Sequence, residues 1–256
     1  MKKLEEKVEK PLDKVVSLTH GNAKQFLEEL TNVVEINYDI LLHFLVSSFE
    51  IRTLDSSEIS MVHAVFNVNY ESPKSDFVVS VSSEALKRII ALGKESTKPI
   101  TLELYMNESE RKLKVIGEAF ETEIEGTLVG KGLPLPSASF RNSFALTKKE
   151  LSNIFKINGE HVVISYSDKG VTFTVIGYDE SKYSLYPKLL TSDITNKDVK
   201  VMVDMERLKR LVKHVKSNQH IIFFYDDAQK PIKMLVHFLD GTEVNYYIAP
   251  IFEDNI

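Results

Sequence analysis

The order of the expected strands and helices in the first half of the chain recurs in the second half. In each half a strand leads into a helix, several strands of alternating apolar residues follow, and a second helix precedes further strands. Recurrence at a period of about half the chain predicts two copies of one domain. The alternation indicates antiparallel sheets with one buried face, so we expect an α+β fold in which two helices per half pack on antiparallel sheets.

Four stretches combine an apolar period of 3.6 residues with N-terminal capping residues, which is typical of helices. They cover 22–34, 83–95, 147–156 and 204–218. Asn22, Ser83 and Thr147 are the expected N-caps of the first three. Glu150 lies three residues after Thr147, so this pair has the spacing of a capping box.

Strands are expected wherever apolar and polar residues alternate between turn residues. They cover 15–20, 36–46, 49–54, 59–68, 77–81, 100–106, 112–117 and 119–125, and then 142–146, 160–167, 171–177, 182–189, 199–203, 220–225, 232–238 and 243–248. The segment 126–139 has three glycines, two prolines and no period, which is typical of a connector. The chain therefore divides into a tail (1–14), a first domain (15–125), the connector (126–139) and a second domain (140–256).

Composition excludes several classes of protein. A net charge of −5 argues against a wholly basic nucleic-acid coat protein, but it leaves room for a local basic surface. The absence of cysteine excludes disulfides, thiolate metal sites and cysteine nucleophiles, and it fits a reducing cytosol. No apolar run approaches the roughly 18–20 residues that a membrane span needs. The N-terminal stretch mixes both signs of charge and lacks a signal-peptide core, so we assign it no function.

The stretch 204–218 has one apolar face and one densely basic face. The basic face carries Arg207, Lys209, Arg210, Lys213, His214 and Lys216. The acidic residues of this stretch, Asp204 and Glu206, lie in its first turn, where the helix dipole favours negative charge. Two interpretations stay open: the face meets the phosphates of a DNA duplex, or it is the solvated surface of an ordinary helix.

Three motifs together give the chain a family resemblance. They are FEIRTLDSSEISMV at 49–62, QKPIKMLV at 229–236 and, most specifically, YYIAP at 246–250. In this order, and with the connector between two similar halves, they resemble the sliding clamps of the proliferating-cell nuclear antigen type. The resemblance extends from about residue 15 to residue 252.

The resemblance implies a DNA clamp fold, in which three two-domain subunits form a ring with an outer layer of continuous sheet and inner helices around duplex DNA. Its subunits would join head to tail, near 118–125 of one and 182–189 of the next, and Pro187 would interrupt pairing there because it lacks an N–H. The implied function is that of a DNA polymerase processivity factor, which tethers replication and repair enzymes. The alternative is a specialised paralogue, such as one subunit of a heterotrimeric clamp or a checkpoint-type clamp.

A clamp needs weak, sequence-independent attraction to phosphates, which basic helices facing the duplex would supply. By resemblance, the DNA-binding pore residues are Lys24, Arg88, Lys156 and Lys213. The helical period adds Lys87, Arg207, Lys209, Arg210 and Lys216. The chain departs from the family at Gln25, Thr31, Ala91 and Asn153, where relatives often carry lysine or arginine. The third helix is also expected to be about a turn shorter, so the pore charge concentrates on the fourth.

The resemblance also implies a partner-peptide site between the connector and the C-terminal segment. The matching positions are Leu54, Ser57, Glu58, Ile59, Met61, Leu133, Pro134, Lys230, Pro231, Tyr247, Ile248, Ala249 and Pro250. An apolar floor with a few backbone hydrogen bonds at its rim is the usual chemistry of such a groove. Glu58 and Lys230 depart from the family, which often has a histidine and an apolar residue there. Without the resemblance, Leu54, Ile59 and Met61 would be ordinary core.

An enzyme is the rival function, and the sequence contains no catalytic constellation. Asp226-Asp227 could hold Mg²⁺, but adjacent carboxylates before a proline-containing strand are typical of a turn. The histidines lack H-x₃-H spacing, and there is neither a nucleophile elbow nor a phosphate-binding glycine loop. We therefore expect no catalytic residue, no metal and no cofactor.

The partners implied by the resemblance fall into three groups. They are double-stranded DNA bound without sequence specificity, a DNA polymerase, clamp loader, nuclease and ligase bound through short peptide motifs, and self or sister subunits in a trimeric ring. No membrane contact is expected. The implied location is cytoplasmic and nucleoid-associated in an archaeon, or nuclear in a eukaryote.

Overall fold

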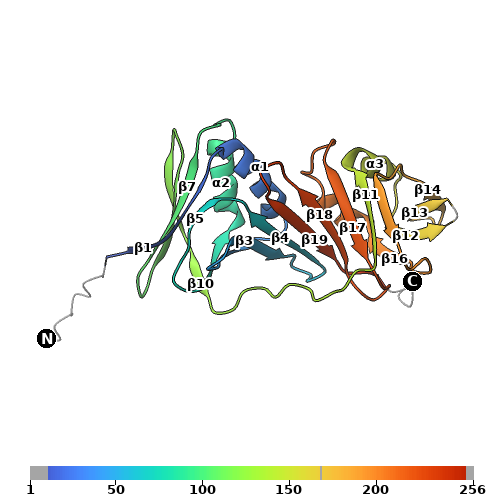
Figure 1. The fold of residues 1–256 in the computed structure, drawn as a ribbon, viewed down its shortest axis with the longest axis horizontal. Coiled ribbons are helices and arrows are strands. Elements are labelled where there is room, and N and C mark those ends of the chain that lie inside the picture. Colours follow the sequence, from blue (N-terminus) through green and yellow to red (C-terminus); the bar gives the residue numbers. More distant parts are fainter. Residues whose placement is uncertain (1–10, 168, 252–256) are drawn as a thin grey trace.

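The computed structural model describes residues 11–167 and 169–251, whose helices and strands form three antiparallel sheets (Figure 1). The first half contains β1 (Asp13–His20), α1 (Ala23–Val34), β2 (Asp39–Phe44), β3 (Phe49–Leu54), β4 (Ser60–Phe66), β5 (Asn69–Glu71), β6 (Phe77–Ser82), α2 (Ser83–Gly93), β7 (Ile100–Met106), β8 (Arg111–Ile116), β9 (Glu121–Glu125) and β10 (Thr127–Val129). The second half contains β11 (Asn142–Thr147), α3 (Lys148–Ile154), β12 (His161–Ser167), β13 (Gly170–Ile176), β14 (Lys182–Leu185), β15 (Thr191–Ile194), β16 (Val201–Asp204), α4 (Met205–Leu211), β17 (His220–Tyr225), β18 (Ile232–His237) and β19 (Glu243–Ile248). The expected α+β fold is confirmed.

The central sheet of ten strands runs through both halves of the molecule. Its order is β10-β6-β2-β3-β4-β19-β18-β17-β11-β15. The halves meet where β4 pairs with β19, so that Met61 lies opposite Tyr247 and Ser60 lies opposite Ile248. Main-chain hydrogen bonds therefore join the first half to the end of the second.

The two faces of the central sheet carry different layers. On β3 every second residue from Phe49 onward is buried. The Phe49 ring lies 5.6 Å from that of Phe66, which lies 5.2 Å from that of Phe26 in α1. We therefore call the face that includes Phe49 the helix face. The opposite face, which includes Glu50, is the connector face, and Figure 1 shows the connector running along the side of the molecule away from α1, α2 and α3.

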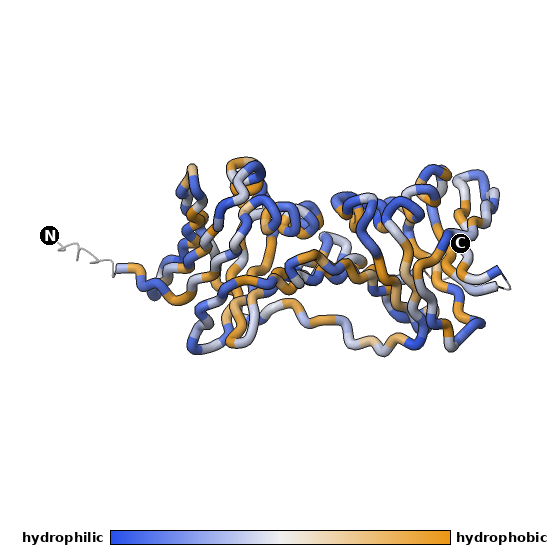
Figure 2. The backbone as a smooth tube through the Cα atoms, turned by 45° about the horizontal axis from the view of Figure 1, so that its top comes forward, coloured by the Kyte–Doolittle hydropathy of each residue, from blue (hydrophilic) through white to orange (hydrophobic). Residues whose placement is uncertain are grey.

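Two smaller sheets flank the helices. One has the order β5-β1-β7-β8-β9 and the other β14-β13-β12-β16, so β9 and β14 are edge strands. The helix α1 packs on α2, β3 and β4, while α4 packs on β16 and β19. A single cluster of buried side chains runs through both halves, and Figure 2 shows the hydrophobic residues concentrated along the strands.

The basic stretch 204–218 is not one helix. The helix α4 ends at Leu211 after seven residues, and the chain continues in turns in which the Lys213 N–H bonds the Arg210 carbonyl at 3.3 Å. Hydrogen bonds of this i→i+3 kind wind the chain more tightly than an α-helix does. Val212 and Val215 are nevertheless buried, so the apolar face persists where the helix stops. The predicted helix is wrong in its second half.

The N-caps agree with the sequence at two of three positions. Asn22 caps α1, and Thr147 caps α3 by accepting a hydrogen bond from the Glu150 N–H at 3.2 Å. The cap of α2 is Ser82 rather than Ser83, because the Ser82 side chain accepts from the Ala85 N–H. The helix α3 has seven residues, as does α4.

Three short strands have no counterpart in the sequence-based assignment. They are β5, β10 and β15, which have three or four residues each and lie at sheet edges, where alternation is too brief to detect. β10 falls inside the expected connector and pairs with β6, Leu128 lying opposite Val79. β14 ends at Leu185, so Pro187 follows the strand instead of interrupting it.

Parts of three expectations lie outside the described residues. They are residues 1–10 of the N-terminal tail, Asp168 in the turn 168–170, and the end of the resemblance at residue 252. β1 begins at Asp13, within the expected tail. None of the helices in the described ranges is long and apolar enough to cross a membrane.

Candidate functional site

The helix α4 presents its cations because its apolar side is anchored. Asp204 caps it, its Oδ1 accepting from the Arg207 N–H at 2.7 Å, and Leu208 is buried against the core. Lys209 forms an ion pair of 2.7 Å with Glu206 in the same helix. The basic side chains therefore extend away from β16 and β19.

The cations that follow α4 pair with acidic residues of the first half. Lys213 Nζ lies 2.8 Å from Glu35, Lys216 Nζ lies 2.5 Å from Glu28, and His214 Nε2 lies 2.9 Å from Glu35. Partial burial acts to raise the pKa of Glu35, but His214 and Lys213 outweigh it and lower that pKa to about 2. Part of the positive charge expected on this side is thus neutralised within the chain.

Two arginines of α4 hold the loop that follows β3. Arg207 Nη1 donates to Asp55 Oδ2 and to Ser57 Oγ, each at 2.7 Å, and Arg210 Nη2 donates to Asp55 Oδ2 at 3.2 Å. The Asp55 side chain is 2% exposed, and its Oδ1 accepts from the Ile59 N–H at 2.8 Å. These arginines, which the helical period assigned to DNA, fasten the second half to the first.

The other predicted DNA-binding side chains are freer. Lys24, Lys87 and Arg88 are exposed and take part in none of the ion pairs among residues 11–167 and 169–251. Lys156 is exposed and donates to Asn153 at 2.8 Å. Of the predicted DNA-binding residues, those without an ion pair among the described residues are therefore three from the first half and Lys156 from the second.

A hollow of about 790 Å³ lies between the halves. Lys24 of α1 lines it from the first half, and Lys216 lines it from the second. His220 and the fully exposed Leu239 also border it. Two predicted DNA-binding lysines that are far apart in the sequence are therefore brought to one concave surface.

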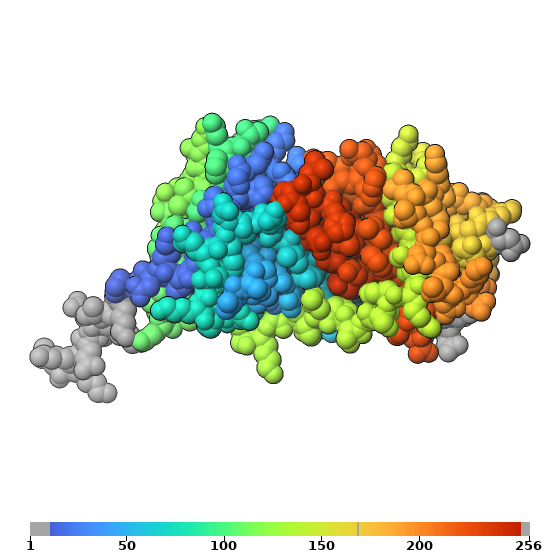
Figure 3. All heavy atoms as spheres, viewed as in Figure 1, coloured from blue at the N-terminus to red at the C-terminus, as the bar shows by residue number. Residues whose placement is uncertain are grey.

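The connector face carries a row of residues predicted for the partner site. Leu54 lies opposite Met61, which lies opposite Tyr247, so three neighbouring strands place these side chains in line. Arg52, two residues before Leu54 and so on the same face, donates to the Leu133 carbonyl at 2.7 Å. The connector is thus tied to the sheet beside this row, and Figure 3 shows it crossing strands of both halves along the lower margin.

The C-terminal segment borders the same row. The Ala249 N–H donates to the Ile59 carbonyl at 2.8 Å, and Ile59 is 37% exposed. Glu58 has a φ of 58°, in the left-handed region that side chains rarely adopt. Ile248 follows Tyr247, so it points to the helix face, where it is fully buried. Ile248, although predicted for the partner site, therefore has its side chain in the core.

No family model matches the sequence. The curated protein named DNA polymerase sliding clamp 2 from Sulfurisphaera tokodaii is 23% identical over 257 residues, which cover 92% of this chain and 99% of the relative. The protein of that name from Sulfurisphaera ohwakuensis has the same identity and coverage. The resemblance to the proliferating-cell nuclear antigen family is confirmed.

Solved structures of clamps share the fold. The PCNA2-PCNA3 complex from Sulfolobus tokodaii matches with a TM-score of 0.70 at 18% identity, over 91% of this chain and 98% of that one. The Thermococcus kodakaraensis clamp matches with a TM-score of 0.73 at 16% identity, over 92% and 100%. The A. fulgidus clamp, solved with the C-terminal region of FEN-1, matches with a TM-score of 0.70 at 15% identity, over 93% and 99%.

Lys230 and the Asp226-Asp227 pair lie in the turn between β17 and β18. Asp226 is buried, is paired with Arg141 and accepts from Lys230 Nζ at 2.8 Å. Hydrogen bonds from Lys230 and Arg141 lower its pKa. The Lys230 N–H closes a turn by bonding the Asp227 carbonyl at 3.1 Å. The carboxylates thus serve a turn, and Pro231 leads from it into β18.

Two polar clusters of the chain were not detectable in the sequence. One joins Glu50, Arg52 and His63 under the connector, with Glu50 Oε2 lying 2.7 Å from Arg52 and 2.9 Å from His63. The other joins His20 to Asp240, 220 residues later, at 3.0 Å. The first cluster is complete only when β3 pairs with β4, and the second joins residues 220 positions apart, so the local pattern of residues could not reveal either.

Proposed function

We propose that the chain is a subunit of a DNA sliding clamp, a processivity factor that encircles duplex DNA and tethers replication and repair enzymes. The observation that carries this proposal is that the two faces of one sheet, which spans both halves, carry different kinds of surface. Basic helices pack on one face, and an apolar row bordered by a connector lies on the other. A clamp needs both at once, since DNA passes on the inside while partners bind outside.

The DNA-facing side would act through diffuse attraction. Lys24, Lys87, Arg88 and Lys156 would meet phosphates directly, and Lys209, Lys213 and Lys216 would do so by exchanging their carboxylate partners for phosphate. Arg207 and Arg210 would contribute less, because they hold Asp55. Retention of the clamp on nicked circular DNA, measured against salt, tests this. Replacing Lys209, Arg210 and Lys213 by alanine should weaken retention, and unaffected retention would contradict a pore role for α4.

The partner side would bind short peptide motifs. The A. fulgidus relative was solved with a C-terminal segment of a partner, which supports the same mode here. Leu54, Met61 and Tyr247 would form the floor, while Leu133, Pro134, Ala249 and Pro250 would form the rim. Polymerase, clamp loader, nuclease and ligase are the expected partners, and no catalytic role is proposed for the chain itself.

The ring would close through the two open edges. The edge strand β9 carries Glu121, Glu123 and Glu125, and the edge strand β14 begins with Lys182. Opposite charge on two unpaired edges supports head-to-tail pairing between copies. A homotrimer should elute at about three times the 29.2 kDa of one chain.

A subunit of a heterotrimer is the second candidate. One observation favours it: the chain neutralises Lys213 and Lys216 with its own Glu35 and Glu28, which lowers the positive charge that one subunit offers to DNA. The Sulfolobus tokodaii structure is itself a complex of two different clamps. A monomer that assembles only with sister subunits would establish this alternative. The archaeal origin of the curated relatives supports a cytoplasmic, nucleoid-associated location.

A further inference from the structure

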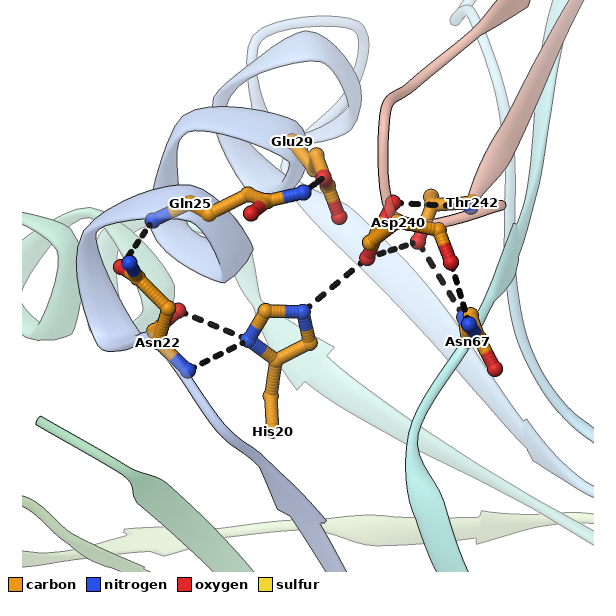
Figure 4. Close-up of polar contacts among 7 residues, drawn as sticks. All are labelled: His20, Asn22, Gln25, Glu29, Asn67, Asp240 and Thr242. Atoms are coloured by element: carbon orange, nitrogen blue, oxygen red, sulfur yellow. Dashed lines mark hydrogen bonds and ion pairs between the residues drawn. The ribbon is translucent and has the colours of Figure 1, made fainter. Parts of the chain in front are cut away.

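Three potential metal ligands meet where the first half touches the turn after β18. They are His20 at the end of β1, Glu29 in α1 and Asp240 in the turn, and their ligand atoms all lie within 4.8 Å of one another (Figure 4). His20 and Glu29 are 6% and 0% exposed. Among residues 11–167 and 169–251, these are the three histidine, aspartate or glutamate side chains that lie close enough together to hold one metal ion.

Glu29 has a buried oxygen without a partner. Its Oε1 accepts a hydrogen bond from Gln25 Nε2 at 3.1 Å, whereas its Oε2 has no hydrogen-bond partner and no exposure. In Figure 4 the free oxygen points toward Asp240. A buried carboxylate oxygen without a donor is costly, so the site favours a positive charge there.

The orientation of His20 leaves its other ring nitrogen available. Nδ1 lies 2.7 Å from the Asn22 carbonyl oxygen and 3.1 Å from the Asn22 backbone nitrogen, so the backbone of Asn22 can partner Nδ1 with or without a proton. Nε2 is directed at Asp240 Oδ2 from 3.0 Å, and it offers a lone pair to a metal when the proton is on Nδ1. An Nδ1–H bonded to a backbone carbonyl is the arrangement that orients Nε2 for a metal.

Asp240 is also held in place. Its Oδ1 accepts from the Thr242 N–H, and its Oδ2 accepts from Thr242 Oγ1, both at 2.9 Å. Thr242 is itself fully buried. Hydrogen bonds of this kind hold a ligating carboxylate in position, so that less conformational entropy is lost when it binds a metal.

We propose that His20 Nε2, Glu29 Oε2 and Asp240 Oδ2 bind one divalent transition-metal ion, for which Zn²⁺ is the first candidate. One imidazole and two carboxylates suit Zn²⁺ and its neighbours in the transition series, whereas Mg²⁺ prefers an octahedral set of oxygens. Tetrahedral bonds of about 2.1 Å place ligand atoms roughly 3.4 Å apart, so small side-chain rotations would close the group around the ion. The ion would fasten β1 and α1 to the β18–β19 turn.

The test uses the full chain, stripped with a chelator and then titrated with Zn²⁺ in a calorimeter. We expect one ion per chain, a rise in Tm with Zn²⁺, and visible d–d absorption with Co²⁺ in the same site. Asp240→Asn, which suits a turn, should lower Zn²⁺ affinity at least about 100-fold, as should Glu29→Gln. His237→Ala is the matched control, because His237 is an exposed histidine 3.3 Å from Glu243 and its loss should change nothing.

Several results would overturn the proposal. They are the absence of Zn²⁺ binding by the stripped chain, unchanged affinity in folded Asp240→Asn, and loss of binding in His237→Ala. Equal binding of Mg²⁺ that survives His20→Ala would also overturn it. A chain that ignores Zn²⁺ and gains Tm in Glu29→Gln would show that the trio holds a proton instead. Circular dichroism of each variant confirms that it is folded, and none of these readouts depends on DNA binding or on clamp assembly.

Discussion

The two faces of the central sheet differ in what holds their surfaces together. On the helix face, charged side chains reach over 150 residues of sequence to one another, as Arg207 does to Asp55 and Lys213 does to Glu35. On the connector face, apolar side chains stand in a row and a single Arg52 hydrogen bond anchors Leu133. Two adjacent residues can point to opposite faces. The Tyr246 hydroxyl donates a hydrogen bond to Asn32 of α1 on the helix face, whereas Tyr247 belongs to the row on the connector face.

This difference shows that the sequence alone cannot tell which basic residues are available to bind DNA, because some of them pair with carboxylates in the fold. The stretch 204–218 looks like the strongest basic feature, yet its cations are mostly occupied by Asp55, Glu28, Glu35 and Glu206. The less conspicuous Lys87 and Arg88 are the free ones. The apolar row, which the resemblance predicted, has no such competition from charged partners, and its role stays a prediction.

The largest expected effect is on stability, from Asp55→Ala. Removing this buried carboxylate takes one acceptor from each of the two α4 arginines and one from the Ile59 N–H, so the free energy of unfolding should fall by about 3 kcal/mol. Urea unfolding measures it. Glu206→Ala is the control, because its pair with Lys209 is exposed and should contribute at most about 0.5 kcal/mol. Equal effects would mean that the α4 arginines do not join the halves.

Tyr247→Ala tests the connector face. Loss of this ring from the row should weaken binding of a partner peptide at least about 30-fold, or about 2 kcal/mol, and should abolish polymerase stimulation while leaving the oligomer's size intact. Peptide fluorescence anisotropy and size-exclusion chromatography measure these. Tyr178→Ala is the control, because Tyr178 is an exposed tyrosine outside the row, and it should change neither peptide binding nor polymerase stimulation. Unchanged stimulation in Tyr247→Ala would contradict the assignment of the pocket.

Two sets of substitutions compare the cations of the halves. Replacing Lys24, Lys87 and Arg88 by alanine should reduce the slope of log affinity against log salt by up to about 2.7, or about 0.9 for each phosphate that is no longer neutralised. Replacing Lys209, Lys213 and Lys216 should reduce it less, because these lysines already pair with carboxylates of the chain and so neutralise fewer phosphates. A larger reduction of the slope from the second set would mean that the cations of the second half, rather than those of the first, neutralise more phosphates. Titration of duplex binding at several salt concentrations distinguishes the outcomes.

The smallest effect is expected from acid on the connector face. Burial lowers the pKa of His43 from its ordinary 6.5 to about 4, so the stability that its neutral form contributes is lost as the pH falls from 6.5 toward 4. Burial would raise the pKa of Glu50, but His63 and Arg52 lower it to about 2, so its contribution is lost as the pH falls below its ordinary 4.5. We expect His43 and Glu50 together to contribute a decrease of roughly 1 kcal/mol between pH 7 and pH 4.5. His43→Gln should shrink this decrease, and urea unfolding at each pH measures it.

The sequence predicts those parts of the molecule that depend on local pattern. The strands β3, β17 and β19 have the expected bounds, because their alternation is long and their turns are marked. The short edge strands β5, β10 and β15 were missed, since three or four residues carry no pattern. The end of α4 was missed because Val212 and Val215 keep the apolar period through turns that are not α-helical.

The candidate site was predictable only as a set of residue types. The row of Leu54, Met61 and Tyr247 followed from the motifs, because those residues occupy strands that pair in register. The partners of the cations could not be predicted, since Lys216 and Glu28 are 188 residues apart. The same holds for His20 and Asp240, which meet through pairing between the halves.

The pairing of β4 with β19 has a consequence for biosynthesis. During translation the first half leaves the ribosome with the β4 edge bare, because its neighbour β19 begins only at Glu243. That edge stays uncovered until residues 67–242 have been made, and contacts across such a span form slowly. A nascent chain of this kind exposes an unpaired strand edge until β19 arrives, and a premature stop codon just before residue 243 would leave an aggregation-prone product.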